Sequence, residues 1–299
     1  MSTPIFYDPR QSVSGLVTYS PSAAKPGRFV ELVTEMCPGV YGDADELRIS
    51  FDPVTREDLY RVHSKAYVNG VFSGTTLNGF ENNDPRVPGS CLWTIGSLWG
   101  AAKAALSNPG QPVCSPTSGF HHAYFGYGGG YCTFNGLMVV AAKLLAENPH
   151  LRIGILDCDF HYGDGTNDIL NRFPELAKSI VHHTSGKSLF PEHDADEYFL
   201  WLQEAVIDLN AKNCDLVLYQ AGADAHKDDP LGGILSTGEM EQRDRHVFYR
   251  LECAVAWNFA GGYQGDGRGD IHHDKVLKLH YNTLRASNDS VRFRRKYFA

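Results

Sequence analysis

Three side chains that can bind a metal ion stand at alternate positions after one apolar run. Residues 153–156 read Ile-Gly-Ile-Leu, and Asp157, Asp159 and His161 follow. In an extended chain alternate side chains point the same way, so these three would share one face. Carboxylates and an imidazole that converge at a strand end suit a divalent metal ion. On its own the segment also fits an acidic turn, because Asp and Gly are common turn residues.

A further acidic residue follows a second apolar run. Residues 216–220 lead into Ala-Gly-Ala and then Asp224. An isolated Asp after a strand is more often the cap of the next helix. A site with two ligands from the first loop needs a third, however. Asp224 could supply it and leave one position open for water or substrate, as catalytic zinc requires.

Two adjacent histidines, His121 and His122, precede the glycine-rich run 126–130. In isolation such histidines are more often packing or surface residues. Beside a metal site they would be natural acid and base groups, because imidazole titrates nearest neutral pH. The glycines are not followed by the Lys-Ser or Lys-Thr pair of a phosphate-binding loop. They indicate instead that the backbone approaches a substrate closely.

A tyrosine follows a Gly-Gly pair near the end of the chain, in Ala260-Gly261-Gly262-Tyr263. Gly-Gly after a strand is a turn signal, and a tyrosine there is more often a packing residue. If its hydroxyl faces the metal, Tyr263 could donate a hydrogen bond to a developing oxyanion.

Short apolar runs that alternate with amphipathic stretches would position these residues. We predict buried strands at 4–7, 47–51, 111–114, 153–158, 179–183, 216–220 and 255–259. We predict helices at 95–106, 135–146, 196–212, 239–250 and 274–284. Strands separated by helices predict an α/β fold, a mostly parallel sheet covered on both faces, in one domain spanning residues 1–299. Ligands bind beyond the carboxyl ends of such strands.

Composition excludes several classes of protein. The chain has 299 residues, of which 42% are hydrophobic, and a formal net charge of -8, which disfavours a broad nucleic-acid surface. Seven scattered cysteines argue against a disulfide framework. No signal peptide or bilayer-spanning stretch is evident. We therefore expect a cytoplasmic protein without a nucleic-acid or membrane partner; its oligomeric state is left open.

Taken in chain order, these motifs resemble the histone deacetylase family, which includes bacterial acetylpolyamine amidohydrolases and acetoin-utilisation proteins. The resemblance runs from Tyr7-Asp8-Pro9-Arg10, through residues 58–64 (Asp-Leu-Tyr-Arg-Val-His-Ser), to Tyr263. It implies an arginase-like three-layer α/β/α sandwich. It also implies a zinc-dependent deacetylase that hydrolyses an acyl amide, usually acetyl, on a lysine-like or other amine.

The resemblance also assigns roles. The implied zinc ligands are Asp159, His161 and Asp224. The implied catalytic residues are the pair His121 and His122, their supports Asp157 and Asp164, and Tyr263. The implied substrate tunnel is lined by Gly130, Tyr131, Phe190 and Leu231, with Asp84 at its rim. We take His122 as the general base, although sequence leaves the division of work within the pair open.

The family also places a structural monovalent cation, usually potassium, at the position of Asp157. That site uses a serine from the next strand, where residues 180–184 read Ile-Val-His-His-Thr. None of these five residues is a serine, so whether the potassium site is kept is left open.

Two other classes of protein compete with this interpretation. An arginase-type ureohydrolase with two manganese ions would use a pattern that residues 224–228, Asp-Ala-His-Lys-Asp, superficially fit. A catalytically silent metal-binding scaffold is the second, although no core position is disabled. The natural substrate, whether acetyl-lysine peptide, acetylpolyamine or another small amide, is left open.

Overall fold

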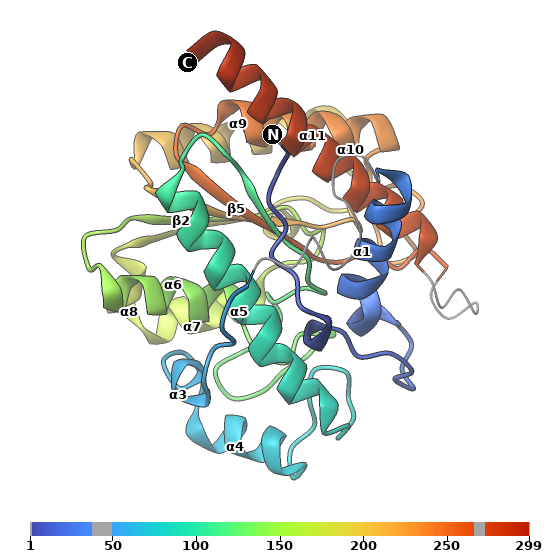
Figure 1. Cartoon of the computed structure of the whole chain (residues 1–299), viewed down its shortest axis with the longest axis vertical. Coiled ribbons are helices and arrows are strands. Elements are labelled where there is room, and N and C mark those ends of the chain that lie inside the picture. The colour runs from blue at the N-terminus through green and yellow to red at the C-terminus, as the bar shows by residue number, and fades with distance from the viewer. Residues whose placement is uncertain (1, 38–49, 266–272, 299) are drawn as a thin grey trace.

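A five-stranded parallel sheet forms the centre of the molecule (Figure 1). The computed structural model describes residues 2–37, 50–265 and 273–298. The strands lie in the order β1-β5-β4-β2-β3, and every pair is parallel. Their bounds are β1 Val113–Ser115, β2 Ile153–Asp157, β3 Ile180–Thr184, β4 Leu216–Ala221 and β5 Ala254–Phe259.

Both faces of the sheet are apolar, and alternate residues of each strand enter different cores. In β4, Leu216 and Leu218 belong to one hydrophobic cluster, whereas Val217 and Tyr219 belong to the other. This is the period-two alternation of a strand that is buried on both sides. It explains why these segments read as continuous apolar runs.

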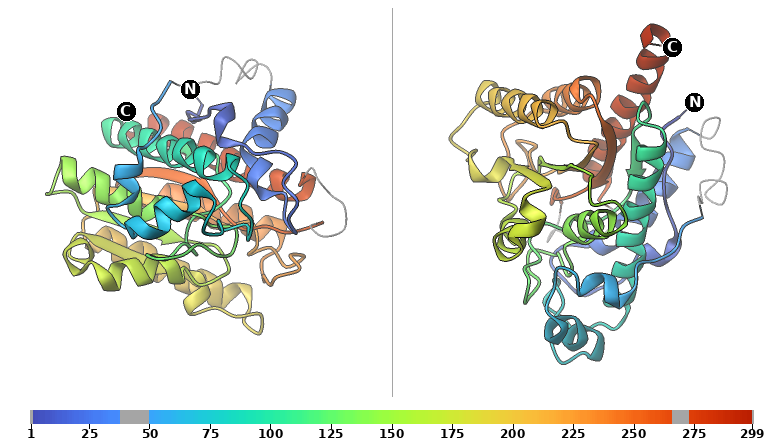
Figure 2. Two further views of the ribbon diagram at one scale, coloured as in Figure 1. Left: turned by 90° about the horizontal axis from the view of Figure 1, so that it is seen from below. Right: turned by 90° about the vertical axis from the view of Figure 1, so that its left-hand side faces the viewer.

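Helices cover each core and make the outer layers of the sandwich. One core packs under α1 Lys25–Met36, α9 Ala195–Ala211, α10 Thr237–Arg250 and α11 Asp274–Phe298. The other packs under α4 Lys65–Ser73, α5 Arg86–Ser107, α6 Gly136–Glu147 and α7 Asp164–Arg172. The short elements are η1 Pro9–Gln11, η2 Ser22–Ala24, α3 Arg56–Leu59, α8 Pro174–Ala177 and η3 Ser185–Lys187. Figure 2 shows α11 extending past the rest of the molecule at its C-terminal end.

The predicted strand at residues 4–7 is wrong. That segment makes one isolated bridge, between Ile5 and Cys114, and then turns into η1 at Pro9. Residues 47–49 of another predicted strand lie outside the described residues, and residues 50–51 are not in a strand. The predicted helix at 95–106 begins earlier in the structure, at Arg86. Pro88 does not prevent this start, because proline is tolerated in the first turn of a helix.

The sheet brings distant segments of the sequence to one edge. Because its strands are parallel, the loops after β1, β5, β4 and β2 all leave from their carboxyl ends, side by side. These loops, with the last residue of β2, Asp157, and the first residue of α7, Asp164, carry the residues that the sequence marked for metal binding or acid-base chemistry. None of the described helices is apolar over a length that would span a bilayer.

Candidate active site

Asp159, His161 and Asp224 converge at this edge of the sheet. One ligand atom from each lies within 4.8 Å of the others, in the only such cluster among the described residues. The Nδ1 atom of His161 is 2.7 Å from Oδ2 of Asp224 and 3.2 Å from Oδ1 of Asp159. Both aspartates are almost fully buried. The three expected ligands therefore meet.

Backbone groups hold the two carboxylates in place. Gly261 N–H donates to Oδ2 of Asp159 at 2.8 Å, and Phe160 N–H donates to Oδ1 of Asp224 at 3.1 Å. A Cβ on Gly261 would lie 2.4 Å from the carboxyl carbon of Asp224. Only glycine lets the turn after β5 approach this closely, which explains the Gly-Gly pair before Tyr263.

The cluster has the electrostatics of a cation site. Burial opposes a charge on His161, but Asp159 and Asp224 outweigh it and raise the pKa of His161 to about 11. Burial, together with the charge of Asp159, raises the pKa of Asp224 to about 7. Two buried carboxylates so close together therefore favour positive charge at this position. A donor set of two carboxylates and one imidazole, with a buried position that requires positive charge, fits a divalent zinc-like ion.

Each histidine of the tandem pair donates to its own carboxylate. His121 Nδ1 lies 2.7 Å from Oδ2 of Asp157, and His122 Nδ1 lies 2.7 Å from Oδ1 of Asp164. The two rings are 4.1 Å apart. Such carboxylates fix the tautomer and turn each Nε2 toward the cluster, where Nε2 of His121 lies 3.6 Å from Oδ1 of Asp159.

The two histidines differ in charge. Burial would lower the pKa of His121, but Asp157 and Asp159 outweigh it and raise that pKa to about 9. Burial, followed by the charge of His121, lowers the pKa of His122 despite Asp164. At neutral pH His122 is therefore the neutral member, suited to accept a proton, and His121 the cationic one.

Tyr263 lies beside the cluster, with its ring 6.2 Å from that of His161. Burial and the nearby charges of Asp159 and Asp224 raise its pKa well above 10, so the phenol keeps its proton and can donate a hydrogen bond. Its backbone N–H donates to Oδ2 of Asp229 at 2.7 Å. Asp229 was not among the residues predicted from sequence.

Three more buried residues, also missed by sequence, hold the backbone and carboxylates of the site. Arg243 Nη1 donates to Gly222 O at 2.7 Å, in the loop that carries Asp224. Lys25 Nζ donates to Ala260 O at 2.9 Å, before Tyr263. Gln220 Nε2 donates to Oδ1 of Asp157 at 2.9 Å. Residue type gave no signal for Lys25 and Arg243, because Lys and Arg are almost never fully buried unless paired.

The residues expected to line the tunnel have different surroundings. Gly130 packs on His122, since a Cβ there would lie 2.5 Å from the imidazole Cδ2, and the Tyr131 ring is 5.7 Å from that of Tyr263. Phe190 and Leu231 are 46% and 44% exposed, as side chains at an entrance would be.

The carboxylate of Asp84 is already engaged. It lies 2.6 Å from the guanidinium of Arg86, which holds the pKa of Asp84 down to about 2. A substrate that used Asp84 as an anchor would have to share it with Arg86.

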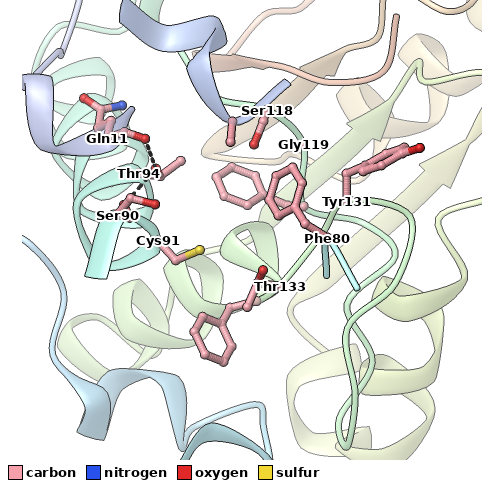
Figure 3. A pocket seen from close by; sticks show the side chains of 12 residues that line it. Gln11, Phe80, Ser90, Cys91, Thr94, Ser118, Gly119, Tyr131 and Thr133 are labelled. Atoms are coloured by element: carbon pink, nitrogen blue, oxygen red, sulfur yellow. Dashed lines mark hydrogen bonds between the residues drawn. The ribbon is translucent and has the colours of Figure 1, made fainter. Parts of the chain in front are cut away.

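A small cavity with a mixed polar and apolar wall is lined in part by Gly119 and Tyr131 (Figure 3). Its volume is about 20 Å³, and Thr94, Ser90 and Thr133 contribute hydroxyl groups to its wall. This is room for about one water molecule.

The residues that a two-manganese site would need point elsewhere. His226 Nε2 lies 2.9 Å from Thr237 Oγ1, and its Nδ1 lies 2.9 Å from Gln264 Nε2. The side chain of Asp228 is 68% exposed. Within the described chain, the arginase-like pattern at 224–228 therefore supplies one metal ligand, Asp224.

Comparisons with known proteins agree with this geometry. A family model of the histone deacetylase domain matches residues 22–199. An uncharacterised protein of Picosynechococcus is 34% identical over 240 residues, which cover 73% of this chain and 79% of that protein. Acetylpolyamine amidohydrolase 2 of Pseudomonas aeruginosa is 25% identical over 190 residues, and the match spans about half of each chain, 54%.

Solved structures share the fold. The acetylpolyamine aminohydrolase from Burkholderia pseudomallei matches with a TM-score of 0.71 at 16% identity, over 97% of this chain and 99% of that one. The protein is thus built on the arginase/deacetylase fold, as expected from the sequence. The chain belongs to the histone deacetylase family, whose members are deacetylases and related amidohydrolases.

Proposed function

We propose that this protein is a zinc-dependent deacetylase of linear amides, acting as a single catalytic domain over residues 1–299. One observation carries the proposal: Asp159, His161 and Asp224 converge beside two histidines that each have a carboxylate partner. A metal cluster alone would fit a scaffold. Proton carriers paired with carboxylates next to it favour an enzyme.

Zinc would be held by Asp159, His161 and Asp224, and when bound it would supply Lewis acidity toward the acyl oxygen and the attacking water. The protein's own residues move the protons. His122, neutral at working pH, accepts a proton from the water. His121, kept cationic by Asp157, stabilises the negative charge that develops and donates a proton to the departing amine.

Tyr263 stabilises the oxyanion of the tetrahedral intermediate. Its phenol keeps its proton because burial raises its pKa. A donor that is already oriented costs no reorganisation during the reaction. Asp229 holds the backbone N–H of Tyr263, and Lys25 holds the carbonyl of Ala260 three residues earlier, so that both keep the tyrosine in reach of the acyl oxygen.

We also propose a structural potassium ion beside Asp157. Thr184 pairs in register with Asp157 and carries the hydroxyl that a serine would otherwise supply. Ser185 Oγ lies 2.5 Å from Asp159 O, so hydroxyl and main-chain oxygens gather there. Oxygen ligands of this kind suit a hard monovalent cation.

The substrate in this proposal is an acylated amine, since relatives carry the name acetylpolyamine amidohydrolase. Tyr131, Phe190 and Leu231 would guide its alkyl chain. The proposed location is the cytoplasm, because all seven cysteines are free thiols, as in a reducing compartment.

A substrate panel tests this function. Purified protein is incubated with acetyl-lysine peptides, acetylated polyamines and small acetamides, and acetate release is measured. We expect turnover that a chelator abolishes and added zinc restores. Full zinc occupancy without turnover on any of these amides would favour the scaffold instead.

A further inference from the structure

The turn that carries Tyr263 has little regular structure of its own. Residues 260–265 lie in neither a helix nor a strand, and the glycines on either side of the Tyr263-Gln264 pair, Gly262 and Gly265, have φ of 118° and 92°. Glycine adopts such conformations readily, but it also leaves the chain free to adopt others. Contacts with the rest of the molecule must therefore fix the place of the Tyr263 side chain.

The segment 224–229, in the loop after β4, supplies two of these contacts. Asp229 accepts a hydrogen bond from Tyr263 N–H at 2.7 Å. In the same segment, Nδ1 of His226 lies 2.9 Å from Nε2 of Gln264. The segment that begins with one of the expected metal ligands thus holds both residues of the turn that lie between its glycines.

The neighbours of His226 define its tautomer. Asp228 N–H donates to Nδ1 at 3.1 Å, so Nδ1 carries no proton and also accepts from the Gln264 amide. The ring proton is then on Nε2, which donates to Thr237 Oγ1 at 2.9 Å, at the start of α10. Burial lowers the pKa of His226, which keeps the ring neutral, as this arrangement requires.

Both partners of the contact between His226 and Gln264 are buried, with exposed fractions of 5% and 7%. Water therefore cannot easily replace either partner. If the acceptor on His226 were lost, the Gln264 amide would be buried without a partner, and the turn would shift toward arrangements that expose this amide to solvent.

We propose that His226 is a positioning residue of the candidate active site: its Nδ1 holds Gln264 and so fixes the turn that presents Tyr263 to the acyl oxygen. The proposal rests on the proposed function, in which Tyr263 stabilises the oxyanion. The histidine of the arginase-like pattern at 224–228 then links the metal-binding loop to the turn that carries the tyrosine, instead of binding a second metal ion.

Two substitutions of His226 separate its two nitrogen atoms. An asparagine amide can place its oxygen near the position of Nδ1, whereas a glutamine amide reaches the position of Nε2. His226→Gln should therefore lose the acceptor for Gln264 and lower kcat about 10- to 100-fold, the range for loss of a supporting partner. KM and zinc stoichiometry should stay unchanged. His226→Asn should restore much of the lost kcat.

A substitution on the other side of the contact tests the same bond. Gln264→Met keeps the length of the side chain but removes the amide, so kcat should fall as it does in His226→Gln. The double variant should be no worse than either single variant, because both remove one shared interaction. Thr237→Val, which removes only the partner of Nε2, is the matched control and should leave kcat unchanged.

Hydrogen exchange of the backbone amides of residues 260–265, measured on zinc-loaded protein by mass spectrometry, tests the proposal without turnover. His226→Gln and Gln264→Met should speed exchange in this segment, and Thr237→Val should not. A purely structural His226 would lower Tm in His226→Gln while the folded protein kept its kcat.

Unchanged kcat in His226→Gln, or an equal loss in Thr237→Val, would overturn the proposal while turnover persists. If the wild-type protein hydrolyses no acylated amine, the proposed function fails. Hydrogen exchange then still decides whether His226 holds the turn that carries Tyr263, and unchanged exchange in His226→Gln would overturn that link.

Discussion

His161 Nδ1 lies 2.7 Å from Oδ2 of Asp224, although 63 residues separate the two in sequence. Neighbouring parallel strands, β2 and β4, create this contact, because Asp157 pairs with Gln220 in register and both loops then turn over the same edge. This is the shorter of the two distances that join His161 to the aspartates of the candidate metal cluster. A metal ion bound there would take the place of the hydrogen bond between His161 and Asp224.

Loss of one carboxylate should release the metal. Asp224→Ala leaves Asp159 and His161, and two ligands hold zinc poorly. We expect affinity to fall by more than the roughly 10- to 100-fold that loss of a supporting partner costs. Equilibrium dialysis against a competing chelator measures it. Asp228→Ala, which removes an exposed carboxylate from the same loop, is the control; equal losses in both variants would contradict the assignment.

Tyr263→Phe should separate metal binding from turnover. The phenyl ring keeps the packing against Tyr131 but removes the hydroxyl donor. We expect unchanged zinc stoichiometry and a kcat lower by about 10²- to 10³-fold, as for other oxyanion donors. Unchanged kcat would remove the tyrosine from the mechanism.

The fall of kcat/KM at acid pH should report the pKa of His122. Burial and the charge of His121 lower its pKa below 6.5, so the base is neutral at pH 7 and activity is lost as pH falls through that pKa. Asp164 acts against this shift. Asp164→Asn should therefore move the acid limb of kcat/KM to still lower pH, with a maximum about 10- to 100-fold lower.

A neighbouring carboxylate provides the control for this profile. Asp168 lies on the same helix, α7, and accepts from Phe125 N–H at 3.0 Å instead of from a histidine. Asp168→Asn should leave the acid limb in place. An acid limb that moves to higher pH in Asp164→Asn would contradict the role of His122.

Arg243 should matter for stability far more than its neighbour Arg245. Its guanidinium is fully buried, 2.8 Å from buried Asp244. Arg243→Met would leave Asp244 uncompensated and should lower the free energy of unfolding by about 3–5 kcal/mol. Arg245→Met, on the same helix, breaks two partly exposed pairs, with Asp289 and Glu241, and should cost about 0–1 kcal/mol. Urea denaturation measures the free energy of unfolding of both variants. Similar losses in the two variants would contradict the stabilising role of the buried Arg243–Asp244 pair.

The sequence predicted those helices and strands that are marked by a pattern of neighbouring residues. The strand that ends at Asp157 is a continuous apolar run, and alternation predicted that Asp157, Asp159 and His161 share one face. The extended strand in fact ends at Asp157, which pairs with His121, while Asp159 and His161 meet Asp224. The burial of Lys25 could not be predicted, because its partner, Ala260 O, lies 235 residues away. The left-handed Glu81 could not be predicted either, since hydrogen bonds between Asn78 and Asn82 impose it.

The most direct test is a titration of metal-free protein with zinc while acetate release from an acetylated amine is followed. If Asp159, His161 and Asp224 hold one catalytic ion, the rate should rise linearly and level off at one zinc per chain. Asp159→Asn protein should stay inactive at the same zinc concentrations. Full activity without metal, or a rate that levels off only at two ions per chain, would contradict the account.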